Sequence, residues 1–284
     1  MIIKLSDRFT YGKLLKFTLP SIAMMIFTSI YSVVDGFFVS NFAGKVAFSA
    51  VNIIMPFLMT VSTVGFMLGT GGTAIVANTF GSGDKEKANR YFSLFVYTAF
   101  VIGSVLSVLG FIFIRTISIS LGASGDILKH CIVYGRIILV ILPFFILQIM
   151  FQSFFIVAEK PRHGLIVAGV TGIINIVLDA ILVILLPVEY KLTGAAIATS
   201  FSQFVGGVIP LVYFTRKNSS ILRLGKTIFD KRILLKACTN GSSEFMSNVS
   251  MSIVGIRYNR QLLKYAGDNG VASFGVIMYV SMIF

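Results

Sequence analysis

Residues 14–40 read LLKFTLPSIAMMIFTSIYSVVDGFFVS, and this stretch decides the fold class. Its apolar run from Phe17 to Ser40 exceeds the roughly 20 residues that a helix needs to cross a bilayer. Lys13 and Lys16 precede the run, and Asn41 ends it. A signal peptide would have a shorter apolar core and a cleavage site flanked by small residues. The stretch therefore predicts a first membrane-spanning helix.

The rest of the chain repeats this pattern. Its 284 residues are 56% hydrophobic and 12% charged, and a soluble domain would have to expose the surplus apolar side chains to water. Runs long enough to span a membrane are predicted at 17–40, 51–78, 91–114, 132–158, 165–187 and 193–215. A more polar seventh helix is predicted at 237–257, and an eighth begins near Gly270. We therefore expect an all-α polytopic membrane protein.

Three segments follow from these runs. Residues 1–215 are expected to form an N-terminal six-helix transmembrane lobe, and the basic segment 216–236 a cytoplasmic linker with a short interfacial helix. Residues 237–284 are expected to be the incomplete start of a C-terminal lobe. LLKFTLPSIAMMIFTSIYSVVDG (14–36) aligns faintly with LLKACTNGSSEFMSNVSMSIVGI (234–256). Lobes related by such a repeat are common in transporters, although chance also explains so low an identity.

The basic residues predict the orientation of the helices. Loops on the cytoplasmic side carry an excess of Lys and Arg. With the N-terminus inside, most of the 24 basic residues fall on that side, in the N-terminal segment, the breaks near residues 85–90 and 160–162, and the linker 216–236. A multi-pass protein of the cell membrane with a cytoplasmic N-terminus is expected, and Arg257, Arg260 and Lys264 weaken this bias only after the seventh helix.

Two carboxylates within apolar runs are the candidates for chemistry. A charged residue at the centre of a spanning helix costs about 2.5–3.5 kcal/mol on insertion scales, so it usually faces a cavity or a partner. Asp35 and Asp179 lie in helices that run in the same direction, at similar depth. Tyr31 and Asn175 each lie four residues earlier, on the same helix face, and Thr199 lies early in the sixth helix.

Together, these carboxylate, phenol, amide and hydroxyl groups could bind a proton or a sodium ion. Burial favours the protonated form of a carboxyl group, so a buried pair can bind and release a proton. The bland alternative places each carboxylate at the outer headgroups, where a charged side chain can reach water. The sequence leaves both interpretations open, and it does not choose between H⁺ and Na⁺.

Other polar residues in the helices carry weaker predictions. Pro20 either permits a bend in the first helix or marks its start. Gln148 and Gln152 share one face of the fourth helix, and they either line a cavity or bond to a neighbouring helix. Glu244, with serines nearby, is a candidate site residue of the second lobe. We expect Arg136 to reach the outer interface.

Several function classes lack their sequence signals. The net charge is +13, but no polar domain is left to bind nucleic acid. Cys131 and Cys238 have no metal-site or disulfide spacing. The glycines of GTGGTAIVANTFGSG (69–83) follow no strand and precede no Lys-Ser/Thr pair, so they indicate close helix packing rather than a phosphate loop. We expect no enzyme, no metal site apart from Na⁺ at Asp35 and Asp179, and no cofactor.

The quoted segments together resemble the N-terminal part of MATE (multidrug and toxic compound extrusion) antiporters, of the bacterial DinF-like or a related type. The resemblance rests on five segments that span most of residues 10–215: LPSI…IYSVVDGFFVSNFAG, GTGGTAIVANTFGSGDKEKANR, LPFFILQIMFQSFFIVAEKPR, INIVLDAILV and LTGAAIATSFSQ. Glu159 departs from it, because a glycine is common there in the family.

The resemblance implies two six-helix bundles around a cleft and export of cationic or amphipathic organic compounds, driven by inward flow of H⁺ or Na⁺. It implies cation coupling at Asp35 with Tyr31 beside it, and at Asn175, Asp179 and Thr199. Pro20 would be the site of bending, and Glu244 would match an acidic residue of some branches. Because a typical member has twelve helices, a separate chain is one expected source of the others.

Two alternatives remain at this point. A lipid-linked oligosaccharide flippase can share this architecture, but flippases tend to carry several basic residues in the cavity, and only Arg136 is a candidate here. The other alternative is a non-transporting fragment of a split transporter gene.

Overall fold

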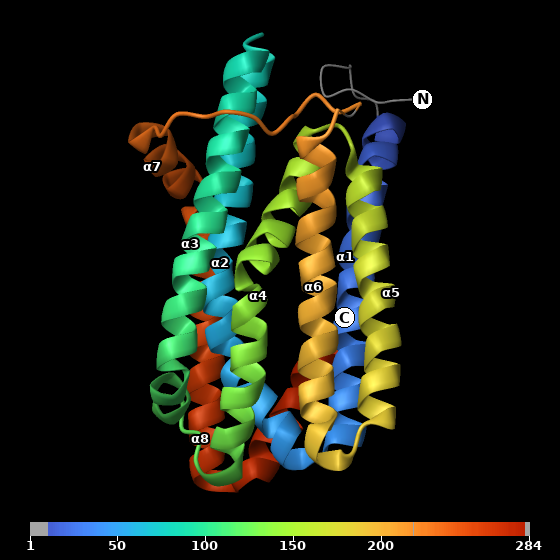
Figure 1. The fold of residues 1–284 in the computed structure, drawn as a ribbon, viewed down its shortest axis with the longest axis vertical. Coiled ribbons are helices and arrows are strands. Elements are labelled where there is room, and N and C mark those ends of the chain that lie inside the picture. The colour runs from blue at the N-terminus through green and yellow to red at the C-terminus, as the bar shows by residue number, and fades with distance from the viewer. Residues whose placement is uncertain (1–10, 218, 282–284) are drawn as a thin grey trace.

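A computed structural model describes residues 11–217 and 219–281 (Figure 1), and all regular structure in these ranges is helical. The long helices are α1 (Tyr11–Phe38), α2 (Lys45–Gly81), α3 (Lys85–Ser120), α4 (Gly125–Val157), α5 (Pro161–Leu185), α6 (Lys191–Thr215) and α8 (Ser242–Ser281). Shorter elements are the π-helical turn η1 (Val39–Ala43), the 3₁₀ turn η2 (Val188–Tyr190) and α7 (Lys231–Asn240). The predicted all-α fold class is confirmed.

Six of these helices are long and apolar enough to cross a membrane, as the hydropathy pattern predicted. Most are longer than predicted: α3 has 36 residues and begins at Lys85 rather than at residue 91. Its first turn is polar but strongly helical, because the Asp84 side chain accepts a hydrogen bond of 3.0 Å from the Lys87 amide and Glu86 pairs with Arg90 at 2.6 Å. The apolar run predicts only the part of a helix that contacts lipid, so it misses polar turns that extend the helix into water.

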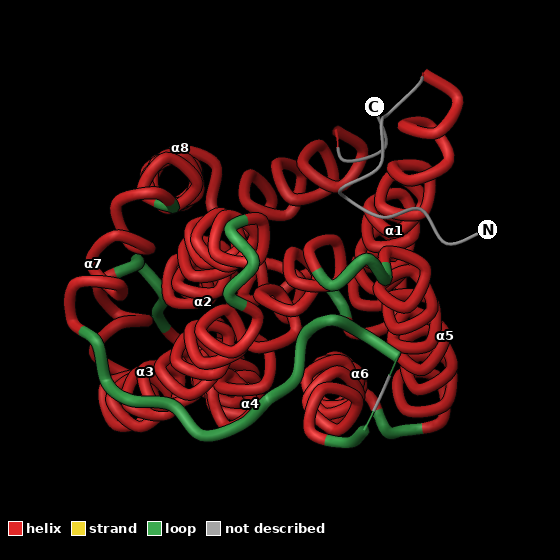
Figure 2. The backbone as a smooth tube through the Cα atoms, turned by 90° about the horizontal axis from the view of Figure 1, so that it is seen from above, coloured by secondary structure: helices red, strands yellow, loops and turns green. Residues whose placement is uncertain are grey.

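The bundle has two parts joined along α4. In Figure 1, α1, α5 and α6 stand on one side, and α2, α3 and α8 stand on the other. Figure 2 shows α4 lying between α3 and α6. An aromatic cluster fills this junction, with the Phe92 ring of α3 at 4.9 Å from the Phe154 ring of α4 and 5.0 Å from the Phe214 ring of α6. Large buried rings at this crossing fix how α3, α4 and α6 pack.

The C-terminal part differs in detail from the prediction. Helix α7 begins at Lys231, inside the predicted linker 216–236, where Asp230 caps it by accepting hydrogen bonds from the Arg232 and Ile233 amides. The predicted helix at 237–257 is divided at Gly241, and the chain continues as α8. Within α8, Gly267 takes φ 60° and ψ −155°, and the break there separates the seventh predicted helix from the eighth. Glycine adopts such a conformation without steric cost.

Pro20 settles one of the open alternatives. It lies in the interior of α1 and not in the first turn, so its interpretation as a helix-start proline is wrong. Proline at an interior position removes one backbone hydrogen bond and crowds the preceding turn, which weakens the helix there. The helix continues for many residues beyond it, up to Phe38.

Candidate functional site

The side chains of Asp35 and Asp179 meet between α1 and α5. Asp35 lies in the last turn of α1, and Asp179 lies in the second half of α5, so both occupy the same end of the bundle. Asp35 is 8% exposed and Asp179 is 0% exposed. Their carboxyl groups are within hydrogen-bonding reach of each other. Both side chains are therefore enclosed between helices, whereas the alternative of headgroup contact requires them to be exposed.

The two paired carboxyl groups repel each other when both are ionised. With both groups ionised, the two Asp179 oxygens are buried without a donor. Two like charges about 4 Å apart repel by roughly 4 kcal/mol at an effective dielectric constant near 20. One shared proton turns the contact into a hydrogen bond between a carboxyl group and a carboxylate. A small monovalent cation would also relieve the repulsion.

Hydroxyl groups from three other helices surround the pair. Thr199 of α6 donates a hydrogen bond of 3.3 Å from Oγ1 to Oδ1 of Asp35. Tyr134 of α4 is 1% exposed, and its hydroxyl is within hydrogen-bonding reach of Thr199. Tyr31 of α1 and Tyr279 of α8 lie close enough to interact with the charge of Asp35. Residues from α1, α4, α5, α6 and α8 therefore converge on one buried point.

Asn175 adds an unsatisfied amide to the same side of α5. It lies one helical turn before Asp179, is 1% exposed, and neither its amide oxygen nor its amide nitrogen has a hydrogen-bond partner. Buried polar groups nearly always have a partner, and an unpaired one usually marks a site for water or an ion. Oxygen ligands of this kind suit hard cations, and a buried carboxyl group can hold a proton.

The other predicted site residues lie elsewhere. Gln152 is half-buried in α4. Glu244 is exposed in the first turn of α8, next to α7, whereas the carboxylate pair lies toward the end of α1. Gln148 is buried against α6, so close to Gly206 that a Cβ there would lie 2.6 Å from its Cδ. Gln148 therefore packs against α6, but its buried Oε1 has no hydrogen-bond partner, so the predicted bond to a neighbouring helix is not seen at this atom.

Tyr134 and Tyr279 were not among the predicted site residues. Each lies in a segment whose other features are ordinary, and their proximity to Asp35 depends on how α4 and α8 pack. The only signal in the sequence is a phenol within an apolar run, where a hydroxyl needs a partner. Gly36 gives a further structural sign, because Tyr279 packs so closely against it that a Cβ would lie 2.6 Å from the ring.

Comparisons with known proteins identify a family and several relatives. The MatE family model matches residues 20–181. The multidrug export protein MepA of Staphylococcus haemolyticus is 26% identical over 267 residues, which cover 94% of this chain and 58% of that protein. MepA of Staphylococcus saprophyticus is 24% identical over 264 residues, covering 93% of this chain and 58% of that protein.

Solved structures show the same fold. The MATE multidrug transporter DinF-BH superposes with a TM-score of 0.86 and 25% identity, covering 99% of this chain and 64% of that one. An inward-facing MATE family transporter of the MOP superfamily gives a TM-score of 0.83 with 22% identity, covering 94% of this chain and 61% of that one. The chain spans less than two thirds of the length of each of these relatives.

The family match covers more than half of the chain, and it includes Asp35, Asn175 and Asp179. The all-helical membrane fold agrees with the solved relatives over almost the whole chain. The chain therefore belongs to the MATE family.

Proposed function

We propose that this chain forms the cation-coupling lobe of an antiporter that exports amphipathic and cationic organic compounds. The observation that carries the proposal is the buried contact of Asp35 with Asp179, surrounded by Thr199 and Tyr134. The names of the relatives support the substrate class, because MepA is described as a multidrug export protein. Transport, rather than catalysis of a reaction, is the role that these relatives suggest.

The proposed cycle depends on competition between the cation and the compound. When the pair is empty, its negative charge favours a cationic compound in the cavity of the assembled transporter. A proton or Na⁺ that enters from outside reduces the negative charge of the pair, so α1 and α5 can repack and the compound is released. By reciprocity, the bound compound weakens cation binding by the same factor. An interior proline at Pro20 gives α1 a weak point at which it can bend.

We also propose that the chain lies in the cell membrane with its N-terminus in the cytoplasm. The linker 216–236 and the start of α3 are basic, and they lie at the end of the bundle where α1 begins. The positive-inside rule places that end on the cytoplasmic side. Asp35 and Asp179 then face the outer half of the membrane, which is the side from which the driving cation enters.

Efflux from cells or vesicles tests the proposal. The chain is expressed in a host without its own efflux pumps, alone and together with the product of any adjacent reading frame that encodes further helices. Loss of a fluorescent lipophilic cation is then followed for the unaltered chain, Asp35→Asn and Asp179→Asn. We expect each substitution to abolish the coupled part of efflux. Full coupled efflux by both variants would overturn the assignment of the site.

The coupling ion is identified by separate jumps in pH and in Na⁺ concentration. In vesicles that contain the unaltered protein, only the true coupling ion drives efflux when its outside concentration is raised. Glu189→Gln is a matched control, since Glu189 is an exposed carboxylate in η2. This control should respond to the same jump as the unaltered protein.

The flippase alternative is less well supported. Arg136, the single basic residue that the sequence offered for a pyrophosphate, is exposed, and its guanidinium lies 5.1 Å from the centre of the Phe111 ring of α3. This contact holds the charge against the flank of α3, away from the carboxylate pair. Flipping of a lipid-linked sugar in the same vesicles would favour the alternative.

A further inference from the structure

A segment that links α6 to α7 forms a strap across α3. The strap, residues 219–230, runs over the end of the bundle where α3 begins (Figure 1). Four hydrogen bonds attach it to α3: Arg223 N to Asn89 Oδ1 (2.7 Å), Gly225 N to Ser93 Oγ (2.9 Å), Thr227 Oγ1 to Arg90 O (2.8 Å) and Tyr97 Oη to Gly225 O (3.2 Å). The strap therefore has a fixed path, and side chains near its end have fixed neighbours.

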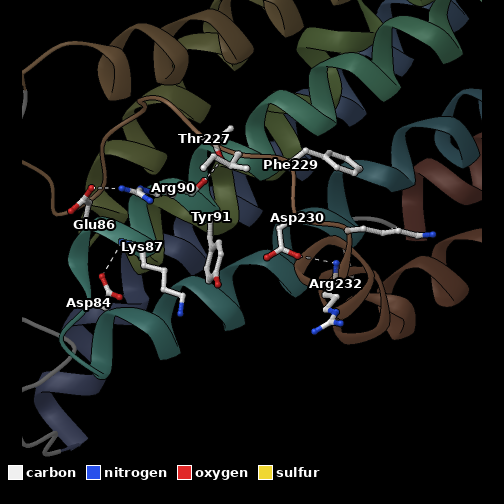
Figure 3. A pocket seen from close by; sticks show the side chains of 11 residues that line it. Asp84, Glu86, Lys87, Arg90, Tyr91, Thr227, Phe229, Asp230 and Arg232 are labelled. Carbon is white, nitrogen blue, oxygen red and sulfur yellow. Dashed lines mark hydrogen bonds and ion pairs between the residues drawn. The ribbon is translucent and has the colours of Figure 1, made fainter.

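A pocket of about 580 Å³ lies between the start of α3, the end of the strap and the start of α7. Figure 3 shows Lys87 and Tyr91 of α3 on one side and Arg232 of α7 on the other. A second hollow of about 300 Å³ shares Asp84, Lys87 and Tyr91 with the first, and it adds Lys236 of α7. The two hollows share these residues, so they form one continuous groove between α3 and α7.

The carboxylates of this pocket already have partners. Asp84 caps α3 by accepting from the Lys87 amide, and Asp230 caps α7 by accepting from the Arg232 and Ile233 amides. Glu86 pairs with Arg90 at 2.6 Å. Their negative charge is therefore largely directed at helix N-termini and one guanidinium, and it is little available to the other cations of the pocket.

The remaining cations have no such partner. In the described ranges, no ion pair within 4 Å joins Lys87, Lys231, Arg232 or Lys236 to a carboxylate. The ammonium of Lys87 lies 5.9 Å from the centre of the Tyr91 ring, and all four side chains are exposed. An anionic group in the pocket could be reached from both α3 and α7, with the Tyr91 hydroxyl between them.

The pocket also lies at the height of lipid headgroups. Exposed apolar side chains on α3 begin at Tyr97 and Phe100, and Arg90 lies about two helical turns, or roughly 10 Å, before Tyr97. The polar headgroup region extends several ångströms beyond the hydrocarbon core on each side. Ile228 and Phe229 line the pocket and are 75% and 74% exposed. Side chains of this kind suit acyl chains, whereas a site for free phosphate has no need of them.

We propose that this pocket binds the headgroup of an anionic phospholipid. The phosphate lies between Lys87 and Arg232, and the upper part of an acyl chain contacts Ile228 and Phe229. Basic pockets at the cytoplasmic ends of membrane helices have the chemistry to bind such headgroups. Because the phosphate contacts both Lys87 of α3 and Arg232 of α7, the bound lipid holds α7 in position relative to the six-helix bundle.

A reporter placed in the pocket tests this proposal. The chain contains no Trp, so Phe229→Trp introduces a single fluorophore beside the expected acyl chain. The protein is reconstituted in phosphatidylcholine vesicles that contain either brominated phosphatidylglycerol or brominated phosphatidylcholine, over the same series of mole fractions. We expect quenching by the brominated anionic lipid at a severalfold lower mole fraction, since each basic residue near such a surface adds roughly fivefold in affinity.

Substitutions in the reporter background separate the site from general surface charge. Lys87→Gln with Arg232→Gln should lower the preference for the anionic lipid about tenfold or more. Lys87→Arg with Arg232→Lys should retain it. Lys13→Gln with Lys16→Gln removes two charges from the start of α1, outside the pocket, and should also retain it. A monodisperse elution profile and an unchanged unfolding temperature establish that each variant is folded.

Three results would overturn the proposal. One is equal quenching by the two brominated lipids. Another is a loss of preference in Lys13→Gln with Lys16→Gln as large as in the pocket variant, which would show general surface attraction. The third is displacement of the brominated anionic lipid by millimolar inorganic phosphate but not by the same ionic strength of chloride, which would assign the site to free phosphate.

Discussion

The hydroxyl group of Thr199 donates a hydrogen bond of 3.3 Å to Oδ1 of Asp35, although 164 positions separate the two residues. The bond joins α6 to the last turn of α1, and it orients the Asp35 carboxyl group beside Asp179. Tyr134 extends the same network into α4. A change in the charge of the pair therefore acts directly on at least four helices, α1, α4, α5 and α6.

Loss of the Thr199 hydroxyl should weaken coupling. Thr199→Val keeps the shape of the side chain but removes the donor, and a hydrogen bond of this kind contributes about 1 kcal/mol. We expect the rate of cation-driven efflux to fall about fivefold. Thr199→Ser retains the hydroxyl and should restore most of the rate. Equal rates for the two variants would show that the hydroxyl does not position Asp35.

Tyr134→Phe should have a similar effect without loss of packing. The ring of Tyr134 is fully enclosed, and phenylalanine fills the same space. The substitution leaves the Thr199 hydroxyl with one partner fewer, so we expect the efflux rate to fall a few-fold while the unfolding temperature stays nearly constant. Tyr190→Phe is the matched control, because the side chain of Tyr190 is exposed. An unchanged rate in Tyr134→Phe would remove this residue from the site.

Gly71→Ala should destabilise the fold. A Cβ at Gly71 would overlap the backbone oxygen of Ala237, and one at Gly241 would overlap the backbone oxygen of Met67. Backbone cannot give way as a flexible side chain can, so α7 must move away from α2. We expect a loss of about 1–3 kcal/mol in the free energy of unfolding.

Gly169→Ala is the control for this prediction. Gly169 lies within α5 and has open space where a Cβ would be added. Alanine should stabilise the helix there by about 0.5–1 kcal/mol, since glycine is the weaker helix former. Thermal unfolding in detergent measures both variants, and the prediction fails if Gly71→Ala unfolds at or above the temperature of Gly169→Ala.

Pro20→Ala should stiffen α1. The substitution restores the backbone donor that proline lacks, and an interior proline weakens a helix by about 3 kcal/mol. If bending near Pro20 accompanies release of the compound, efflux should slow while binding of the fluorescent cation is retained. Ser21→Ala changes the neighbouring residue without altering the backbone donors, and it should leave efflux unchanged. Normal efflux by Pro20→Ala would remove the bend from the cycle.

The membrane-spanning helices were predictable because lipid selects apolar residues over a fixed length. The helix ends were not predictable from hydropathy, because a water-exposed helical turn such as the one at Lys85 is as polar as a loop. That turn is helical because Asp84 caps it. The division at Gly241 was not predicted, and the break at Gly267 was predicted only as a gap between a helix at 237–257 and one that begins near Gly270. The first depends on a close approach to α2, and the second depends on a backbone angle, and neither changes the apolar content of the sequence.

The site could be predicted in part. Asp35 and Asp179 stood out because an acidic residue in lipid needs a reason to be there, and helix direction placed them at similar depth. Their contact, and the approach of Tyr134 and Tyr279, follow from the packing of five helices and leave no local pattern in the sequence. Glu244 carried the same kind of signal as Asp35, but it lies exposed in the first turn of α8.

The most direct test of the central claim asks whether Asp35 and Asp179 hold one cation together. Infrared difference spectra of the purified chain, recorded over a pH series with and without Na⁺, report the carboxyl and carboxylate bands of the pair. We predict a shared-proton or Na⁺-dependent band that disappears in both Asp35→Asn and Asp179→Asn and is unchanged in Glu189→Gln. A band that persists in either single variant would contradict the shared site, as would two permanently ionised carboxylates that do not respond to pH or Na⁺.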